Sequence, residues 1–485
     1  MLKKLESLEP EWLRKIEIPN WLVLVVALVF IARIPTFLEP FHDINELSYL
    51  IVGQSLLQGK VIYREVFATQ APLIYFIALV SGNIFWMKAA TCVAIIASLL
   101  FFWKLTQQLF PKRQIMATVA TVAFAFLTTI PTFEGNLVST EIFSLTFVIL
   151  SFWLLLNIKS GNLNYLLSGL FFSLALLIRP LAIFEIVGFW VYLLLSKKLT
   201  KKDLRMILTF KLGLFLPIVI AFFCFYFRES FNQFLDIVIK NSFQIKDSGL
   251  FIQALAIVSG SVIVLNHFKK KLTKGFLFST AWFLASLFSV TFVQKISGQN
   301  LLVIIPAVSI LIAILLTSIK IDQTLSILPL LLLSIFIIKT NLIYISSFEY
   351  YANFLSYVSG KQTKEEYFKY FGDQTFRDFE ISEFIANSCD KKSSIFVWGN
   401  SPAVYAMSDR SFTTRYFNTK DISSIKLKIS TIDSLYKDRP KFVVVTKDSP
   451  GFRELNNFLI SNYILIKELS GAKIWKSVEN ISALR

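Results

Sequence analysis

Ionisable side chains gather between residues 39 and 76, immediately after the first long apolar run of the chain. They include Glu39, His42, Asp43, Glu46, Arg64 and Glu65. A carboxylate placed here can take a proton from an acceptor hydroxyl group, and a guanidinium can bind a phosphate. Asp43 is the candidate base, and Glu46, one helical turn on, would hold the acceptor or orient Asp43. The alternative for both is a solvated carboxylate at the membrane rim.

A second pair of acids lies in the segment IPTFEGNLVSTEIF, where Glu134 and Glu141 stand at the edges of apolar runs. Ionisable groups at such places are costly, so a functional role is the default hypothesis. The alternative for Glu141 is a place in the first turn of a helix that Ser139 or Thr140 caps. Both acids therefore remain candidates for binding an acceptor or a metal.

Two cations are candidates for a phosphate. Arg179 lies in LLIRPLAI, where the following proline ends the apolar helix. Its guanidinium could clamp a phosphate in bidentate fashion, or it could extend to lipid headgroups. Arg64 is the other candidate. The chain has no glycine-rich phosphate loop, which argues against a nucleotide-sugar donor, and its two histidines do not form a metal pair.

The elements that position these residues are membrane helices. The chain has 485 residues, of which 55% are hydrophobic, which is too apolar for a soluble globular protein. The net charge of +17 comes from basic clusters between apolar spans, which suits anionic membrane lipid rather than nucleic acid. The three cysteines imply no disulfide framework.

We predict eleven spans on the length that a bilayer requires. They lie at about 20–38, 88–110, 115–131, 141–157, 164–179, 181–196, 206–227, 250–267, 275–293, 301–319 and 324–345. The piece 72–87 is interrupted by Ser81, Gly82 and Asn83, so we assign it to the first outer loop, 39–87, as a surface or re-entrant segment; a twelfth span is the alternative. Within this loop we predict a surface helix from Ser48 to Gln58 that ends at Gly59.

Basic clusters at residues 3–15, 111–113, 197–205 and 269–274 all fall on the same side of these spans by parity, and the opposite loops are poorer in Lys and Arg. The positive-inside rule then predicts a cytoplasmic amphipathic N-terminus, residues 1–19, and an odd number of spans places the tail outside the cell. From 346 to 485 the pattern changes to short β-rich runs, 394–399 and 441–446, and helical runs, 374–388 and 451–461. The predicted fold is therefore a polytopic α-helical membrane domain, 20–345, with a small extracytoplasmic α/β domain.

The first outer loop resembles that of the GT-C membrane glycosyltransferases, in particular the protein O-mannosyltransferase and aminoarabinose-transferase-like group. An acid after the first membrane helix, an aliphatic helix and then LLQGKVIYREVFATQAPLIY carry this likeness. A second match, SIFVWGNSPAVYAMSDRSFTTRYF, is similar to the tail domain of bacterial members. Three positions depart from the family pattern: Ile44 replaces a second acid, Gln70 a common lysine and Ala71 a proline.

The resemblance implies a cell-envelope enzyme that moves a sugar from a polyprenyl-phosphate donor to a lipid, glycan or protein acceptor. It implies Asp43 as the base and Glu141 as a second acid that assists metal or acceptor binding. Because Gln70 removes the usual lysine, Arg179 is the first choice for the donor phosphate, with Arg64 and Lys295 as further candidates. The cofactor stays open, with Mg²⁺ or Mn²⁺ as an option. The alternatives are a non-catalytic membrane assembly protein and a transporter of lipid-linked glycans.

Overall fold

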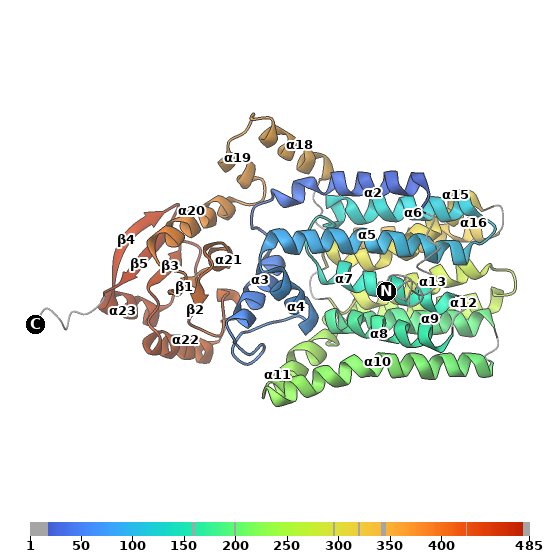
Figure 1. Cartoon of the computed structure of the whole chain (residues 1–485), viewed down its shortest axis with the longest axis horizontal. Helices are drawn as coiled ribbons and strands as arrows, with labels where there is room; N and C mark the ends of the chain where they lie inside the picture. Colours follow the sequence, from blue (N-terminus) through green and yellow to red (C-terminus); the bar gives the residue numbers. More distant parts are fainter. Residues whose placement is uncertain are drawn as a thin grey trace, which may run out of the picture.

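The computed structural model describes residues 18–157, 161–197, 200–293, 296–318, 321–340, 346–422 and 424–478. A long helical bundle forms one end of the molecule, and a smaller domain with a five-stranded sheet forms the other (Figure 1). The helices α3 (Ile44–Leu57) and α4 (Pro72–Ser81) lie between the two parts (Figure 1). The predicted fold class is therefore confirmed.

The bundle contains a helix for each of the eleven predicted spans. The helices are α2 (Asn20–Ala32) with η1 (Ile34–Phe37), α5 (Ile84–Leu109), α6 (Gln114–Thr129), α7 (Thr140–Leu156), α8 (Asn162–Ile178), η3 (Pro180–Ala182) with α9 (Ile183–Ser196), α10 (Lys201–Phe227), α12 (Ser248–Phe268), α13 (Lys274–Val290), α14 (Gly298–Leu301) with η5 (Leu302–Ile304) and α15 (Ile305–Thr317), and α16 (Ile321–Leu325) with α17 (Ile327–Lys339). By length and composition, six of the described helical segments are long and apolar enough to cross a membrane. The shorter apolar helices have 10 to 17 residues.

Helix α4 is the shortest of these apolar helices. Its 10 residues rise about 15 Å, half of the roughly 30 Å of a hydrocarbon core. It ends at Gly82, which has a φ of 70°, and the side chain of Asn83 then accepts a hydrogen bond from the backbone N–H of Trp86 to begin α5. The chain is therefore broken between α4 and α5.

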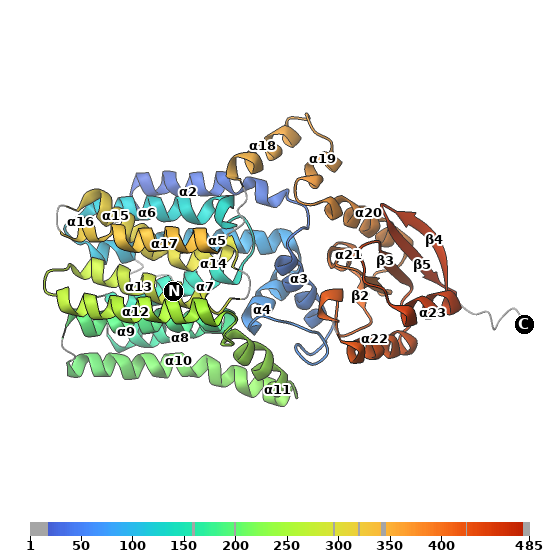
Figure 2. The ribbon, with the colours of Figure 1, turned by 180° about the vertical axis from the view of Figure 1, so that it is seen from behind.

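Apolar side chains fall into two groups in the bundle. Helices α7, α13 and α15 bury most of their side chains in the centre. In α10 and α12 the apolar side chains point outward, among them Leu212, Phe223 and Ile263. Figure 2 shows α12 and α17 on the surface of the bundle. An outward apolar surface of this kind suits contact with lipid.

A short helical segment continues α10 on the side of the C-terminal domain. It comprises α11 (Phe231–Phe234) and a π-helical turn, η4 (Leu235–Lys240). On the opposite side of the molecule, α18 (Ser347–Val358) and α19 (Lys364–Lys369) connect the bundle to the sheet domain (Figure 1). The connection thus runs along the outside of the first outer loop.

The C-terminal domain is a mixed sheet with helices packed on it, in the strand order β2-β1-β3-β5-β4. Strands β1 (Ser394–Trp398), β2 (Ser411–Phe412) and β3 (Phe442–Thr446) run parallel, and β5 (Ala472–Ser477) pairs antiparallel with β3 and β4 (Tyr463–Leu469). The helices are α20 (Asp373–Ser388), α21 (Ala403–Ser408), η6 (Thr419–Asp421), α22 (Ile425–Lys437) and α23 (Arg453–Asn462). The β-rich and helical runs predicted from the sequence correspond to β1, β3, α20 and α23.

Candidate functional site

Asp43 is the N-cap of α3, which begins four residues earlier than predicted. One carboxylate oxygen, Oδ1, accepts hydrogen bonds from the backbone N–H groups of Asn45 at 3.0 Å and Glu46 at 2.9 Å. The Oδ2 atom has no hydrogen bond to the residues that the structure describes. Burial raises the pKa of Asp43, and the two N–H groups only partly oppose this effect. The helix also ends as predicted, because Gly59 has a φ of 83°.

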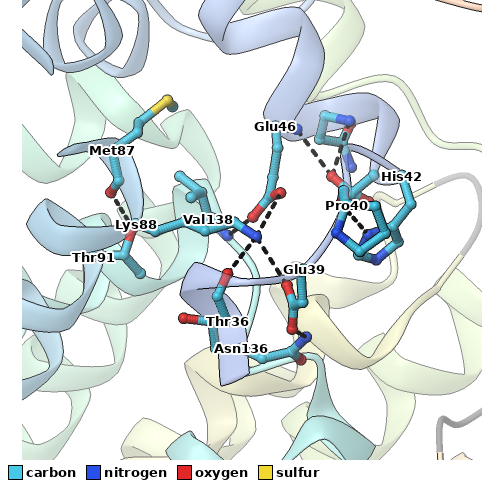
Figure 3. Close-up of polar contacts among 12 residues, drawn as sticks. Thr36, Glu39, Pro40, His42, Glu46, Met87, Lys88, Thr91, Asn136 and Val138 are labelled. Atoms are coloured by element: carbon cyan, nitrogen blue, oxygen red, sulfur yellow. Dashed lines mark hydrogen bonds and ion pairs between the residues drawn. The ribbon is translucent and has the colours of Figure 1, made fainter. Parts of the chain in front are cut away.

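Glu46 is buried, in contrast to a solvated rim residue, and it belongs to a network around Lys88 of α5 (Figure 3). The Lys88 ammonium lies 2.9 Å from Glu39 Oε2 and 3.9 Å from Glu46 Oε2, and it donates to the carbonyl of Thr36 at 2.8 Å. Glu46 Oε1 accepts a hydrogen bond from the backbone N–H of Val138 at 2.6 Å. Glu46 therefore joins the start of α3 to α5 and to residues 130–139 between α6 and α7, which we call the second outer loop.

The charges of this network affect its two carboxylates differently. Burial raises the pKa of Glu46 to about 7, because the opposing effect of Lys88 is incomplete and Asp43 and Glu39 add repulsion. Burial also acts on Glu39, but Lys88, His42 and two hydrogen bonds outweigh it and hold the pKa of Glu39 below its usual value. Glu39 is thus the ionised partner of Lys88.

Glu39 also connects the second outer loop and α18. Its Oε1 accepts a hydrogen bond from Asn136 Nδ2 at 2.8 Å and another from the hydroxyl of Tyr350. Arg33, fully buried at the end of α2, donates to the backbone carbonyls of Gly135 and Asn136. The end of α2, α5, the second outer loop and α18 are therefore held together around Arg33 and Glu39.

Glu134 of the second outer loop lies close enough to interact with the charges of Asp43 at the start of α3 and of Glu141 in α7. Glu134 has a left-handed backbone, with a φ of 54°, and its Oε2 accepts from the backbone N–H of Gln299 at 3.3 Å. Burial raises its pKa. Glu141 is buried in the first turn of α7, where Oε1 accepts from Asn300 at 3.0 Å and Oε2 from Thr140 at 3.0 Å. Glu134 therefore lies within electrostatic range of an acid from each of the two segments.

The capping alternative also holds for this segment. The Ser139 hydroxyl accepts a hydrogen bond from the backbone N–H of Ile142 at 3.3 Å and begins α7. Glu141 then occupies the first turn, where an acid suits the helix dipole. Its place in the first turn is not its only role, because its Oε1 also accepts a hydrogen bond from Asn300.

Arg179 follows the last residue of α8 and points into the protein. Its Nη1 lies 3.2 Å from Glu185 Oε1 of α9, and its Nη2 donates to Ser289 Oγ of α13 at 2.9 Å. Both charged side chains are buried, and Trp282 donates to the other oxygen of Glu185 at 3.4 Å. The guanidinium is thus already paired with a carboxylate, so it does not extend to lipid headgroups.

The remaining predicted cations lie elsewhere. Arg64 is at the surface of the first outer loop and forms ion pairs with Glu65 and Glu229, both at 3.0 Å. Lys295 lies outside the described residues. The structure therefore does not bring Arg64 into the group of acids around Asp43.

The acids do not fit a metal in their present arrangement. Among the described residues no group of three or more His, Cys, Asp or Glu side chains could hold a metal ion. Oxygen atoms of Asp43, Glu134 and Glu141 are instead occupied by backbone and side-chain donors. We therefore derive no step that uses Mg²⁺ or Mn²⁺.

An apolar cavity of about 180 Å³ lies between α4, α8, α9, α10 and η4. Its lining includes Ala71 and Pro72 of the first outer loop, Leu177 and Pro180 on either side of Arg179, and Phe222 of α10. An apolar chain would fit its surface chemistry. A larger cavity, of about 640 Å³, lies between the first outer loop and helices α20 and α21.

Sequence reasoning missed Lys88 and Glu185. Both were placed inside or at the edge of a predicted span, and an ionisable residue in a membrane helix is a signal for a specific partner. The signal does not identify the partner, since Lys88 and Glu39 are 49 positions apart in the chain. For Glu185 the partner Arg179 is only six positions away.

The arrangement of the bundle, the first outer loop and the C-terminal domain is the ArnT fold. The crystal structure of ArnT from Cupriavidus metallidurans bound to undecaprenyl phosphate matches with a TM-score of 0.63 and 12% sequence identity, covering 95% of this chain and 98% of that chain. The apo structure of the same protein matches with a TM-score of 0.60 and 11% identity over the same shares. At this identity the likeness shows the fold alone.

The sequence family is defined separately. Residues 4–328 match the family model described as "Putative competence-induced protein Ccs4 N-terminal domain", and the chain belongs to this family. A comparison with curated proteins finds no match.

Proposed function

We propose that this protein is a membrane glycosyltransferase that moves a sugar from a polyprenyl-phosphate donor to a lipid, glycan or protein acceptor at the outer face of the cell membrane. The observation that carries the proposal is the ArnT fold over 95% of the chain, with Glu134 within electrostatic range of both Asp43 and Glu141. One of the ArnT structures is bound to undecaprenyl phosphate, which supports the choice of donor.

Asp43 is the base in this proposal. Its Oδ2 takes the proton of the acceptor hydroxyl, the acceptor oxygen bonds to the first carbon of the sugar, and the bond from that carbon to the phosphate oxygen breaks. The electron pair leaves with the polyprenyl phosphate. A raised pKa suits a base that works near neutral pH. Glu46 positions Asp43 through the start of α3, and Glu134 and Glu141 bind acceptor hydroxyl groups.

The donor phosphate would lie against Arg179, with its lipid tail in the apolar cavity that Leu177 and Pro180 line. Glu185 orients the guanidinium through one hydrogen bond. An arginine carries five N–H groups, so other N–H groups of Arg179 would donate to the phosphate. Arg64 and Lys295 remain further candidates for the phosphate. Gln70 precedes the cavity residue Ala71 and can donate a neutral hydrogen bond in place of the lysine that is common in the GT-C glycosyltransferases.

The test is turnover by the full-length protein in membranes with a panel of polyprenyl-phosphate sugars, measured as release of the lipid phosphate. We expect release with one donor, and its loss in Asp43→Asn. No release from any donor, with undecaprenyl phosphate still bound, would favour a non-catalytic membrane assembly protein, which the substitutions Ile44 and Gln70 allow. Movement of an intact lipid-linked glycan across the bilayer would instead show a transporter.

A further inference from the structure

The C-terminal domain contacts the first outer loop in more than one place, since α21 also packs against α3. Residues 412–417, which begin at the last residue of β2, contact residues 60–67 of the loop. Lys60 Nζ donates to the carbonyl of Phe412 at 3.0 Å, and the backbone N–H of Phe67 donates to the carbonyl of Arg415 at 3.0 Å. Arg415 Nη2 donates in turn to the carbonyl of Tyr63 at 2.6 Å. Figure 1 shows β2 beside this loop.

The residue that Arg415 contacts has an unusual backbone. Tyr63 has a φ of 67°, in the left-handed region that costs a bulky residue roughly 1–2 kcal/mol. Such a conformation persists only where the surrounding structure determines it. The Tyr63 ring is fully buried against Phe225 of α10 and Phe234 of α11, at 5.5 and 5.8 Å between ring centroids. The bundle therefore holds the side chain, while Arg415 and a local hydrogen bond from the Tyr63 N–H to the carbonyl of Val66 hold the backbone.

A hydrogen bond connects Tyr63 to the chain just before the residues that line the apolar cavity of about 180 Å³, which we call the donor cavity. Its hydroxyl donates to the carbonyl of Gln70 at 2.8 Å, while the hydroxyl of Tyr75 accepts from the backbone N–H groups of Thr69 and Gln70 at 3.2 and 3.0 Å. Gln70 is thus held from both sides by tyrosines. The next residues, Ala71 and Pro72, line the apolar cavity.

The path continues to Asp43 through helix packing. At Gly53 of α3 an added Cβ would lie 2.8 Å from the backbone nitrogen of Leu79 of α4, so the two helices touch backbone to backbone. A shift of residues 69–72 at the start of α4 would therefore move α3 as well. Asp43 caps the beginning of α3.

We propose that Arg415 is a positioning residue through which the C-terminal domain sets the conformation of residues 60–72, and with it the donor cavity. This inference rests on the proposed function for the meaning of the cavity, but the contact itself does not. Arginine suits this place because its planar group lies over the ring of Tyr416, 5.5 Å from the centroid, while it donates to a carbonyl.

The experiment compares the full-length wild type with Arg415→Ala and Arg415→Lys in lipid nanodiscs. The matched control is Lys391→Ala, which removes an exposed cation of the same domain that pairs with Asp409. Amide hydrogen exchange is measured for residues 60–71, and binding of undecaprenyl phosphate is measured on the same samples. A charged hydrogen bond of ordinary strength predicts that exchange accelerates about 10-fold or more in Arg415→Ala.

We expect faster exchange at 60–71 and at least several-fold weaker undecaprenyl phosphate binding in Arg415→Ala, smaller changes in Arg415→Lys, and none in Lys391→Ala. Unchanged exchange in Arg415→Ala, or equal exchange changes in Lys391→Ala, would overturn the inference. Should Arg415→Ala not fold, wild-type exchange and affinity in Arg415→Lys would overturn the requirement for a planar group. Absence of binding in the wild type would count against the proposed function alone, because the exchange measurement still decides the role of Arg415.

Discussion

Oδ1 of Asp43 caps α3, and in the proposed function the other oxygen, Oδ2, takes the acceptor proton. Asparagine caps a helix as well as aspartate does, but it cannot take a proton. We therefore expect Asp43→Asn to keep the melting temperature and to lose about 10²- to 10⁴-fold in turnover, the range for a lost general base. Turnover and thermal unfolding of the purified protein measure the two effects.

Asp43→Ala is the control that separates the roles. It removes the cap as well as the base, so it should cost about 1 kcal/mol of stability beyond Asp43→Asn with no further loss of turnover per folded molecule. Near wild-type turnover by Asp43→Asn would remove this residue from the mechanism.

Glu46 predicts a dependence of stability on pH. Its pKa in the folded protein is raised, so the folded state binds the proton more tightly than the unfolded state. The stability that this proton contributes is complete at low pH and is lost as the pH rises from about 4.5, the ordinary value, to about 7. The free energy of unfolding of Glu46→Gln, relative to that of the wild type, should therefore increase by an amount on the order of 1–3 kcal/mol between pH 5 and 8.

Thermal unfolding at several pH values measures this difference. The variant keeps an oxygen for the N–H of Val138, and Lys88 keeps Glu39 as its partner. Glu65→Gln, a change at an exposed carboxylate of the same loop, is the control. A constant difference between wild type and Glu46→Gln across this range would contradict the prediction.

Residues close together in the chain could be recognised as a group, but their partners could not. Asp43 and Glu46 stood out because they follow an apolar run, and their spacing of three places both at the start of one helix. Lys88 and Tyr350 join them only because α5 and α18 fold against that start. No local pattern encodes contacts of this length, so the sequence predicted a rim site where the structure has a buried network.

At the scale of elements, the break between α8 and α9 explains why Arg179 is buried. Pro180 ends α8, and the following turn returns the chain so that Arg179 meets Glu185 of α9 and Ser289 of α13. Breaking a buried ion pair on one side typically costs about 3–5 kcal/mol. Arg179→Ala should thus lower the melting temperature markedly, and Arg179→Lys should recover stability and donor binding only in part.

A double variant separates stability from donor binding. Replacing Arg179 and Glu185 together by methionine and leucine removes both charges and fills similar volume, so stability should largely return. Undecaprenyl phosphate binding should not return if Arg179 holds the phosphate. Recovery of both in the double variant would move the phosphate site to Arg64 or Lys295.

Helix limits were predictable where composition changes sharply and less so where a side chain decides them. The eleven spans follow from runs of apolar residues, which must be helical in a bilayer. The start of α3 depends on a single carboxylate, Asp43, and the start of α5 on a single amide, Asn83. The strand order of the C-terminal domain depends on pairing between distant segments, such as Val443 with Trp475, which strand patterns do not specify.

At the scale of the whole molecule, the candidate site and the basic loop residues lie in different parts of the bundle. The C-terminal domain, the first outer loop and the candidate site lie at one end of the bundle (Figure 1). A cavity of about 240 Å³, lined in part by Lys112, Arg113 and Lys274, is formed by the α5–α6 connection and the start of α13. These basic residues belong to the clusters that the positive-inside rule places in the cytoplasm. The site end would then be outside the cell.

Cysteine labelling tests this orientation in intact cells. In a background with serine at Cys92, Cys224 and Cys389, one new cysteine replaces Lys391 of the C-terminal domain and another, in a separate variant, replaces Lys270 between α12 and α13. Both lysines are exposed. A thiol reagent that cannot cross membranes should label Lys391→Cys in intact cells and Lys270→Cys only after lysis, because eleven spans place the two positions on opposite sides. The reverse pattern would mean that α4, which lies between Asp43 and both labelled positions, is a twelfth span. Alternatively, it would mean that the whole bundle is inverted, with the acids around Asp43 in the cytoplasm, where a donor presented at the outer face could not reach them. Labelling of both positions in intact cells would mean that one of the spans between them, formed by α13, by α14, η5 and α15, or by α16 and α17, has been assigned wrongly.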